Sequence, residues 1–265
     1  MIRAWLLLLA AGISLTAQDK VTIPLSAPGQ PATIKARLLT GSITITAGTG
    51  PELIVEEKSS AANPKQSARN APPPGMHRLD TGAGGLDIEE DHNVVTIRGE
   101  RTHNDLVITT PANTSVELKT VSASHIEITG LSGDIDVENT NGSMVLKNLS
   151  GAVVAHTLNG GIVATLDHVA ADKPMSFTSL NGKLEVTLPA DTKARLRLKT
   201  NHGEVYSDFD VKLEPDENKP VVGDARGQGG KYRIRMDRGV TGSINGGGPE
   251  YLFQTMNGDI LIHKK

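Results

Sequence analysis

The sequence predicts an all-β protein built as a single β-solenoid, a β-helix-like coil of short strands with roughly 18 to 22 residues per coil. Three observations lead to this fold class. A motif of glycine followed by alternating apolar residues recurs along the chain, four copies are evenly spaced, and only 3% of the 265 residues are aromatic. Alternation with a period of two is typical of strands with one buried face, and no segment keeps a helical period. A narrow core of Val, Ile, Leu and Ala accounts for the shortage of rings.

The N-terminus is predicted to be a secretory signal peptide covering residues 1–17. Arg3 precedes an apolar run from Ala4 to Leu15, and Ala17 precedes a polar residue. A positive charge, a short apolar run and a small residue before a polar one are typical of a cleaved export signal. The run is shorter than the roughly 18 to 20 residues of a membrane span. We therefore expect export, cleavage after Ala17, and no transmembrane span in the mature chain.

Two loops are expected to interrupt the solenoid. Residues 18–62 supply its N-terminal strands, and residues 63–85 form a loop because they are rich in Pro and Gly. Residues 86–265 carry the solenoid repeats, with a second loop near 214–230.

The spacing of the corner glycines indicates a repeat of 18 residues. Gly133, Gly142, Gly151 and Gly160 lie nine residues apart, and their corners alternate between Leu-Ser-Gly and Asn-Gly. One unit therefore holds two strands and two unlike corners, where glycine allows a sharp turn. Further copies of the motif begin at Gly41, Gly182, Gly203 and Gly258. The copies at Gly182 and Gly203 follow after 22 and 21 residues, which fits one further coil each with small insertions.

An antiparallel meander is the alternative architecture, because Asn-Gly between alternating strands is also a strong hairpin signal. The solenoid is favoured because Asn141 and Asn159 recur one full unit apart and could hydrogen-bond along one corner. It also makes Leu131 and Leu149 vertical neighbours, with coils ~4.8 Å apart. The inward positions expected to be buried are Ile135, Val137, Met144, Leu146, Val153, Ala155, Ile162, Ala164, Leu184, Val186, Ile260 and Ile262.

These residues also carry a family resemblance. The stretch 106–120, Leu-Val-Ile-Thr-Thr-Pro-Ala-Asn-Thr-Ser-Val-Glu-Leu-Lys-Thr, leads into the Ser-Gly-Asp-Ile and Asn-Gly repeats, and 255–262 closes with Asn-Gly-Asp-Ile. From about Gly41 to the C-terminus the chain resembles the bacterial DUF4097 family of adhesin-like proteins, relatives of toast-rack β-repeat modules of envelope proteins. The resemblance implies a β-solenoid outside the cytoplasm, and it brings no catalytic residues with it.

Composition and motif searches exclude several functions. The absence of Cys excludes disulfide scaffolds, thiolate zinc sites and cysteine nucleophiles. A net charge of −3 argues against nucleic acid as a partner. Calcium binding is disfavoured because the residue after the corner glycine is acidic in only three of eight copies. We assign no catalytic residue, no cofactor and no metal ligand.

One acidic cluster could in principle serve glycan cleavage, which needs two carboxylates flanking a sugar cleft. It consists of Asp87, Glu89, Glu90 and Asp91, with His92 beside them. The cluster borders the Pro- and Gly-rich loop, and the chain has few rings to stack on sugars. A charged turn is therefore the favoured interpretation.

Two basic runs are candidate contacts for an anionic polymer. The first is Lys193, Arg195, Arg197 and Lys199, and the second is Lys231, Arg233 and Arg235. Alternation places each run on the outward face of its strand, opposite apolar residues. The alternative for both is a face that only keeps the protein soluble.

The sequence therefore predicts an exported, non-enzymatic β-repeat protein that acts as an adhesin or as an envelope scaffold. We expect it in the periplasm, on the cell surface or secreted, with a cell-envelope glycan or another envelope protein as its partner. The alternative is a carbohydrate-active β-helix enzyme acting on an envelope or extracellular polysaccharide. Such an enzyme would need charged side chains that converge on one solenoid face.

Overall fold

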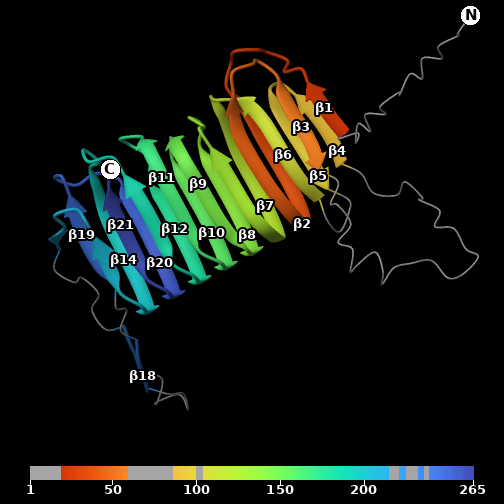
Figure 1. Ribbon diagram of the computed structural model, residues 1–265. Helices are drawn as coiled ribbons and strands as arrows, with labels where there is room; N and C mark the ends of the chain where they lie inside the picture. Colours follow the sequence, from red (N-terminus) through yellow and green to blue (C-terminus); the bar gives the residue numbers. More distant parts are fainter. Residues whose placement is uncertain (1–18, 59–85, 100–103, 215–220, 225–231, 236–238) are drawn as a thin grey trace, which may run out of the picture.

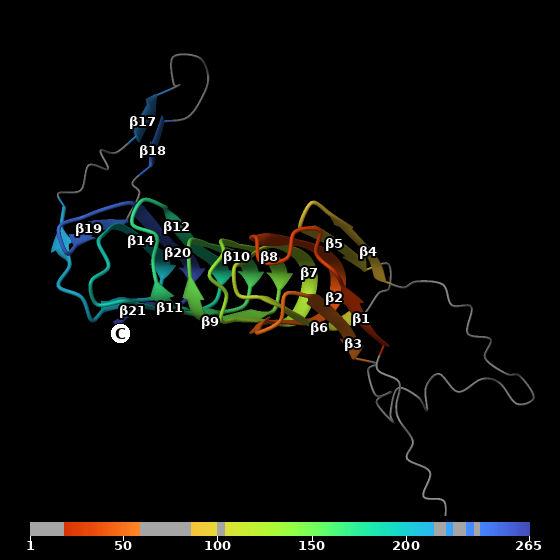
Figure 2. The same cartoon turned by 90° about the horizontal axis from the view of Figure 1, so that it is seen from above.

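The computed structural model describes residues 19–58, 86–99, 104–214, 221–224, 232–235 and 239–265. All regular elements in these residues are strands, β1 to β21, so the predicted all-β fold class is confirmed. The predicted signal peptide and the loop 63–85 lie outside the described residues. Figure 1 shows the strands side by side along one elongated body, and Figure 2 shows that they form two layers.

One layer, here called the front sheet, carries the candidate site described below. In spatial order it contains β4 (Leu86–Asp91), β5 (Val94–Gly99), the first half of β2 (Ala32–Gly48), the first half of β7 (Thr114–Thr129), β8 (Ile135–Asn141), β10 (Val153–Asn159), β12 (Met175–Asn181), β20 (Glu250–Asn257), β14 (Ala194–His202), β19 (Val240–Ile244) and β16 (Lys212–Leu213).

The second layer, the back sheet, lies on the other side of the core. It contains β1 (Asp19–Ile23), β3 (Leu53–Lys58), β6 (Asn104–Pro111), the second halves of β2 and β7, β9 (Ser143–Ser150), β11 (Ile162–His168), β13 (Leu184–Leu188), β21 (Ile260–Lys264) and β15 (Val205–Ser207). Both layers belong to one 19-stranded hydrogen-bonded sheet, because β2 and β7 run through the corner between them.

The pairing of the central strands confirms the solenoid and shows that the meander is wrong. β8, β10 and β12 pair in parallel on the front sheet, as do β9, β11 and β13 on the back sheet. Antiparallel pairs occur at the two ends, where β1 lies on β3, β4 on β5, and β19 on β14 and β16. β17 (Val221–Asp224) and β18 (Tyr232–Arg235) pair with each other in a separate two-stranded sheet, so part of the expected second loop is a strand.

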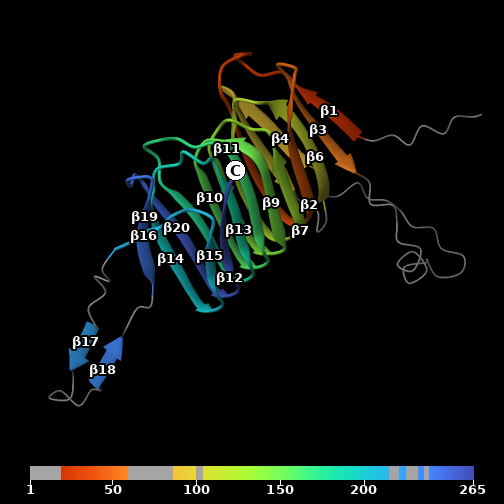
Figure 3. The ribbon, with the colours of Figure 1, turned by 60° about the vertical axis from the view of Figure 1, so that its left-hand side comes forward.

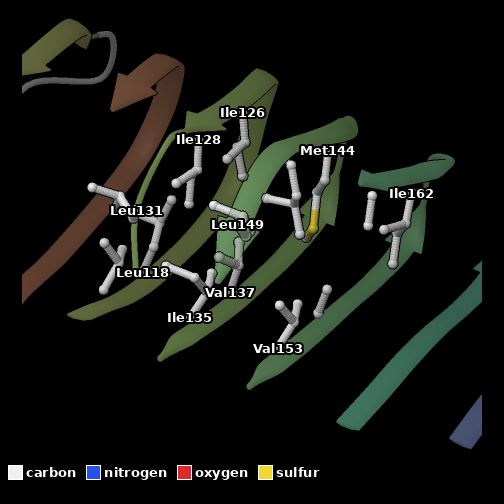
Figure 4. Packing of buried hydrophobic residues seen from close by; sticks show 14 of the residues in the cluster. Leu118, Ile126, Ile128, Leu131, Ile135, Val137, Met144, Leu149, Val153 and Ile162 are labelled. Carbon is white, nitrogen blue, oxygen red and sulfur yellow. The ribbon is translucent and has the colours of Figure 1, made fainter. Parts of the chain in front are cut away.

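The core lies between the two sheets and follows the predicted alternation. All twelve inward positions predicted from the sequence are buried, with exposed fractions of 2% or less. Figure 4 shows ten of the cluster's residues by name, pointing into the space between the layers. The rings gather further along the chain, where Phe177 on β12 stacks on Phe253 on β20 with 5.3 Å between ring centroids.

The glycine corners hold the coils at close range. Gly142 has a φ of +130°, and a Cβ built there would lie 1.7 Å from the carbonyl oxygen of Ala123 in the neighbouring coil. The backbone N–H of Gly142 donates to the carbonyl oxygen of Asn159 on the other side, at 2.8 Å. A side chain would disrupt this stacking, which explains why the motif begins with glycine.

The order of the coils in space differs from their order in the chain. β20 and β21 lie between the coil of β12 and β13 and the coil of β14 and β15, as the blue β20 shows between β12 and β14 in Figures 1 and 3. The expectation that the Gly203 coil follows directly on the Gly182 coil is therefore wrong. A similar insertion occurs near the other end, where β2 lies between β7 and the pair β5 and β6.

The residues at the Asn-Gly corner fit this order. Asn257 on β20 carries the side chain that can extend the column of stacked asparagines, and the coil of β14 carries His202 at that position. The coil with the asparagine lies inside the stack, and the coil with the histidine lies at its end.

Candidate functional site

The outer face of the front sheet presents side chains in two straight rows, because the parallel strands pair in register. The first row is Thr96, Lys35, Glu117, Asp136, Val154, Ser176, Leu252 and Arg197. The second row is Arg98, Arg37, Lys119, Glu138, His156, Thr178, Gln254 and Lys199. Neighbouring members of a row lie on adjacent strands, ~4.8 Å apart. We take this face as the candidate functional site.

Positive charge gathers in two regions of the front face. At the N-terminal end Lys35 and Arg37 of β2 lie beside Arg98 of β5 and Lys119 of β7. At the other end β14 presents Arg195, Arg197 and Lys199, with Lys193 just before the strand. Five strand steps, or about 24 Å, separate β7 from β14.

Between the two positive regions lies a smaller acidic region formed by Glu117, Asp136 and Glu138. Asp136 lies next to Glu117 and Val154 in the first row. Partial desolvation raises the pKa of the Asp136 carboxyl, and repulsion from Glu138 and Glu117 adds to this shift despite the opposing charge of Lys119. Because β4 carries the exposed Asp87 and Glu89 beyond the first positive region, the front face changes sign three times along its length.

The predicted basic residues are only partly brought together. Lys193, Arg195 and Arg197 are exposed on the front sheet, as expected from the alternation. The Arg195 guanidinium is paired with Glu214, with Nη2 2.9 Å from Oε2. Arg233 and Arg235 lie on β18, in the separate two-stranded sheet, and Lys231 lies outside the described residues.

Sequence reasoning missed the positive cluster of Lys35, Arg37, Arg98 and Lys119. These residues come from three strands that are distant in the chain and meet only because β2 is inserted between β5 and β7. The available signal was their alternation with buried residues, as in Lys35-Ala-Arg37. Alternation gives the outward direction of a side chain but not its neighbours on other strands.

The acidic cluster around Glu90 lies at the hairpin between β4 and β5. The Glu90 carboxylate accepts hydrogen bonds from the backbone N–H and hydroxyl of Ser26, and its Oε1 also accepts from the N–H of Asn93. The bond from the Ser26 N–H is the main cause of the lowered pKa of Glu90. Glu90 thus connects the hairpin to the segment that precedes β2, so its role is structural.

The Asn-Gly corner carries a ladder of side-chain amides, as predicted for Asn141 and Asn159. Asn159 donates to Asn141 at 2.8 Å, Asn181 donates to Asn159 at 2.7 Å, and Asn257 donates to Asn181 at 2.6 Å. Two residues before Asn159, Asn181 and Asn257 a buried hydroxyl donates to the carbonyl of a corner glycine, for example Ser179 to Gly160 at 2.9 Å. Before Asn141 the side-chain amide of Asn139 takes this position. This second column was not predicted from the sequence.

Between the amide ladder and the buried hydroxyls runs a line of exposed apolar side chains. Its members are Leu39, Val121, Leu158, Leu180 and Met256, with exposed fractions from 37% to 51%. We call this line the corner ridge. It follows the edge of the solenoid beside the second row of the front face.

Two hollows lie at the N-terminal end of the front face. The larger, about 430 Å³, lies against the corner ridge and is mainly apolar, with Leu38, Leu39 and Val121 in its wall. The smaller, about 220 Å³, is mainly polar and includes Lys35, Thr96 and Glu117. Arg37, Arg98 and Lys119 line both hollows.

Two kinds of feature, a metal-binding cluster and a membrane-spanning helix, are absent from the described residues. These residues hold no group of three or more His, Asp or Glu side chains placed to bind a metal ion. They also hold no helix with the length and apolarity needed to cross a bilayer.

Parallel coils with glycine corners and polar outward rows define a β-repeat module of the toast-rack class. The chain belongs to the Toastrack DUF4097 family, whose sequence model matches residues 20–241, and this confirms the predicted family. Among solved structures, a "putative cell adhesion protein" from Clostridium sporogenes is similar over 94% of this chain and 100% of that chain, with 11% identity and a TM-score of 0.49. No curated protein sequence matches the chain.

Proposed function

We propose that this protein is an exported, non-enzymatic, adhesin-like module that holds an extended anionic polymer of the cell envelope against its front face. The observation that carries the proposal is the register of the two outward rows. It places positive charge in two regions of one rigid face, about 24 Å apart at the strand spacing. A long polyanion could contact both positive regions at once.

The chemistry of the face favours many weak contacts over one reactive centre. Arg37, Arg195 and Arg197 are exposed and lie on a sheet surface, where each charge contributes modestly and is screened by salt. Several such contacts on one polymer add together because they are held in a fixed geometry. Binding should therefore weaken in steps as charges are removed.

Export is part of the proposal and is supported by the signal-like residues 1–17. Expression of the full chain in a bacterial host, followed by fractionation and N-terminal sequencing, tests it. We expect the mature protein outside the cytoplasm with Gln18 at its N-terminus. Retention of the full-length chain in the cytoplasm would contradict the export component.

The binding component is tested by retention on immobilised polygalacturonate, with neutral dextran as the control resin. Charge reversals are combined in the order Arg197→Glu, Lys199→Glu and Arg37→Glu, and retention is measured at low and physiological salt. We expect a stepwise loss of retention, with salt acting in the same direction because the Debye length is ~8 Å at physiological ionic strength. Lys147→Glu on the back sheet changes the net charge equally and should have little effect.

Two results would overturn the proposal. Equal retention of the Lys147 and Arg197 variants would show that net charge, and not the front face, causes binding. If the protein hydrolysed the polymer and a single carboxylate substitution abolished that activity, the protein would be a carbohydrate-active enzyme and not a binding module.

A further inference from the structure

Arg37 occupies an unusual position at the centre of the N-terminal positive cluster. In the second row it lies directly between Arg98 on β5 and Lys119 on β7. Arg98 has a partner on its outer side, with Nη1 3.3 Å from Oδ2 of Asp87. Lys119 has a partner on the next coil, with Nζ 3.3 Å from Oε1 of Glu138. Among the described residues Arg37 has no ion pair.

This arrangement costs stability in the free protein. Like charges at directly opposed positions on neighbouring strands repel one another, and here the central charge lies between two others of the same sign. The partners of Arg98 and Lys119 lie on the far side of each from Arg37. One positive charge is therefore left for an external anion to neutralise.

The surroundings of Arg37 indicate that the anion carries an apolar group. The apolar hollow of about 430 Å³ begins at Arg37 and continues to Leu39 and Val121, which are 51% and 50% exposed. The aliphatic stems of arginine and lysine add apolar surface to such a wall while their charged groups stay accessible. The hollow has the volume of a small-ligand site.

We propose that this junction binds a medium-chain alkyl carboxylate, with the carboxylate on Arg37 and the alkyl chain in the apolar hollow. A carboxylate matches the planar fork of a guanidinium through two parallel hydrogen bonds. Its single negative charge matches that of Arg37, which has no ion pair within the described part of the chain. The chain would cover Leu39 and Val121, which are otherwise exposed to water. This site goes beyond the proposed polymer binding, because it rests on one unpaired arginine and an apolar hollow.

Calorimetric titration of the protein with decanoate, below its micelle concentration, tests the proposal directly. We expect saturable binding of one decanoate per chain. Acetate offers the carboxylate with almost no alkyl chain, and decanol offers the alkyl chain without the carboxylate. Each should bind at least about tenfold more weakly than decanoate, because either the contact with the apolar hollow or the pair with Arg37 is missing. Decanol binding as tightly as decanoate would overturn the role of Arg37. Decyl phosphate binding about tenfold more tightly than decanoate would overturn the choice of a carboxylate.

Substitutions separate the two halves of the site. Arg37→Gln should lower decanoate affinity by about tenfold or more, since a charge-assisted pair is lost. It should also raise the melting temperature of the free protein by relieving the repulsion in the row. Val121→Thr combined with Leu39→Ser should weaken decanoate while leaving the weak binding of acetate unchanged.

Matched controls lie elsewhere on the same surface. Leu158→Ser removes an apolar side chain from the same corner ridge, outside the hollow, and Arg197→Gln removes a charge at the other end of the front face. Both should leave decanoate affinity unchanged. Unaltered decanoate affinity in Arg37→Gln, or no decanoate binding by the parent protein, would overturn the proposal. If polymer retention depended on Arg197 but the protein did not bind decanoate, the proposed polymer binding would be supported and the alkyl carboxylate site would be refuted.

Discussion

The side-chain amide of Asn257 donates a 2.6 Å hydrogen bond to the side-chain oxygen of Asn181, although 76 residues separate the two in the chain. Asn181 in turn donates to Asn159 at 2.7 Å. Asn181 is therefore both acceptor and donor at the point where the chain order of the coils is interrupted. The ladder joins the inserted coil of β20 to the regular stack.

Replacing Asn181 with Ala should destabilise the protein by about 1 to 2 kcal/mol, because two side-chain hydrogen bonds are lost and each contributes about 1 kcal/mol. Urea unfolding of the two proteins measures the difference. Leu180→Ala, at the preceding exposed position, is the control and should change the free energy of unfolding much less. An Asn181→Ala variant as stable as its parent would show that the ladder contributes nothing measurable.

Replacing Ile135 with Asp should destabilise the stack by several kcal/mol. Ile135 is 2% exposed, and an unpaired carboxylate at that position would lose its hydration without gaining a partner. Thermal unfolding followed by circular dichroism measures the effect. Leu158→Asp introduces the same group at a position that is 39% exposed and should be tolerated. A parent-like melting temperature for the Ile135 variant would contradict the inward register of β8.

Replacing Gly142 with Ala should be far more damaging than replacing Gly29 with Ala. Both glycines have positive φ, +130° and +86°, so both substitutions strain the backbone by about 1 kcal/mol or more. Only Gly142 also meets a neighbouring carbonyl oxygen, whereas nothing lies within 4 Å of a Cβ at Gly29. Comparing the two unfolding free energies separates the cost of close packing from the cost of the turn. Equal losses would mean that close stacking of the coils is not what requires glycine.

Asp136 should make the protein less stable at neutral pH than an uncharged residue would. Its pKa is raised in the folded state, so the ionised carboxylate is disfavoured there relative to the unfolded chain. The cost is fully present above the folded pKa and disappears as pH falls below the unfolded pKa. Asp136→Asn should therefore raise the melting temperature at pH 7, and the gain should vanish near pH 3.

Glu127 is a control residue, because its pKa is shifted in the opposite direction to that of Asp136. A 2.8 Å hydrogen bond from Lys147 lowers its pKa, so its contribution to stability is present above the unfolded pKa and is lost as pH falls through the folded pKa. Glu127→Gln should therefore lower the melting temperature at pH 7. If both variants shifted the melting temperature in the same direction, the electrostatic explanation for Asp136 would be wrong.

Local repetition made most of the fold predictable. The alternation after each corner glycine placed residues such as Val137 and Ile162 in the core, and the 18-residue period brought Asn159 onto Asn141. Both signals act within a coil or between consecutive coils. They carry no information on which distant coil becomes a neighbour, and the expectation that the Gly203 coil follows directly on the Gly182 coil was wrong for that reason.

The candidate site on the front face could be predicted from the sequence only where its residues lie on one strand. The run on β14 was visible in the sequence because Arg195 and Arg197 lie on one strand. The cluster around Arg37 was not visible, because its members lie on three strands that pair only in the folded protein. A clue was present at the Asn-Gly corner, where His202 replaces asparagine in the coil that ends the stack.

The insertion of β20 and β21 also affects how the chain can be made. Synthesis completes β12 and β14 before Glu250 leaves the ribosome, yet these two strands pair through β20 and not with each other. Until β20 arrives, each has an unpaired edge, which is a site for faulty association. Contacts between segments this distant also form slowly. A chain that ends before Glu250 would therefore keep two open strand edges, and we expect it to associate with itself and to be cleaved by proteases more readily than the full chain.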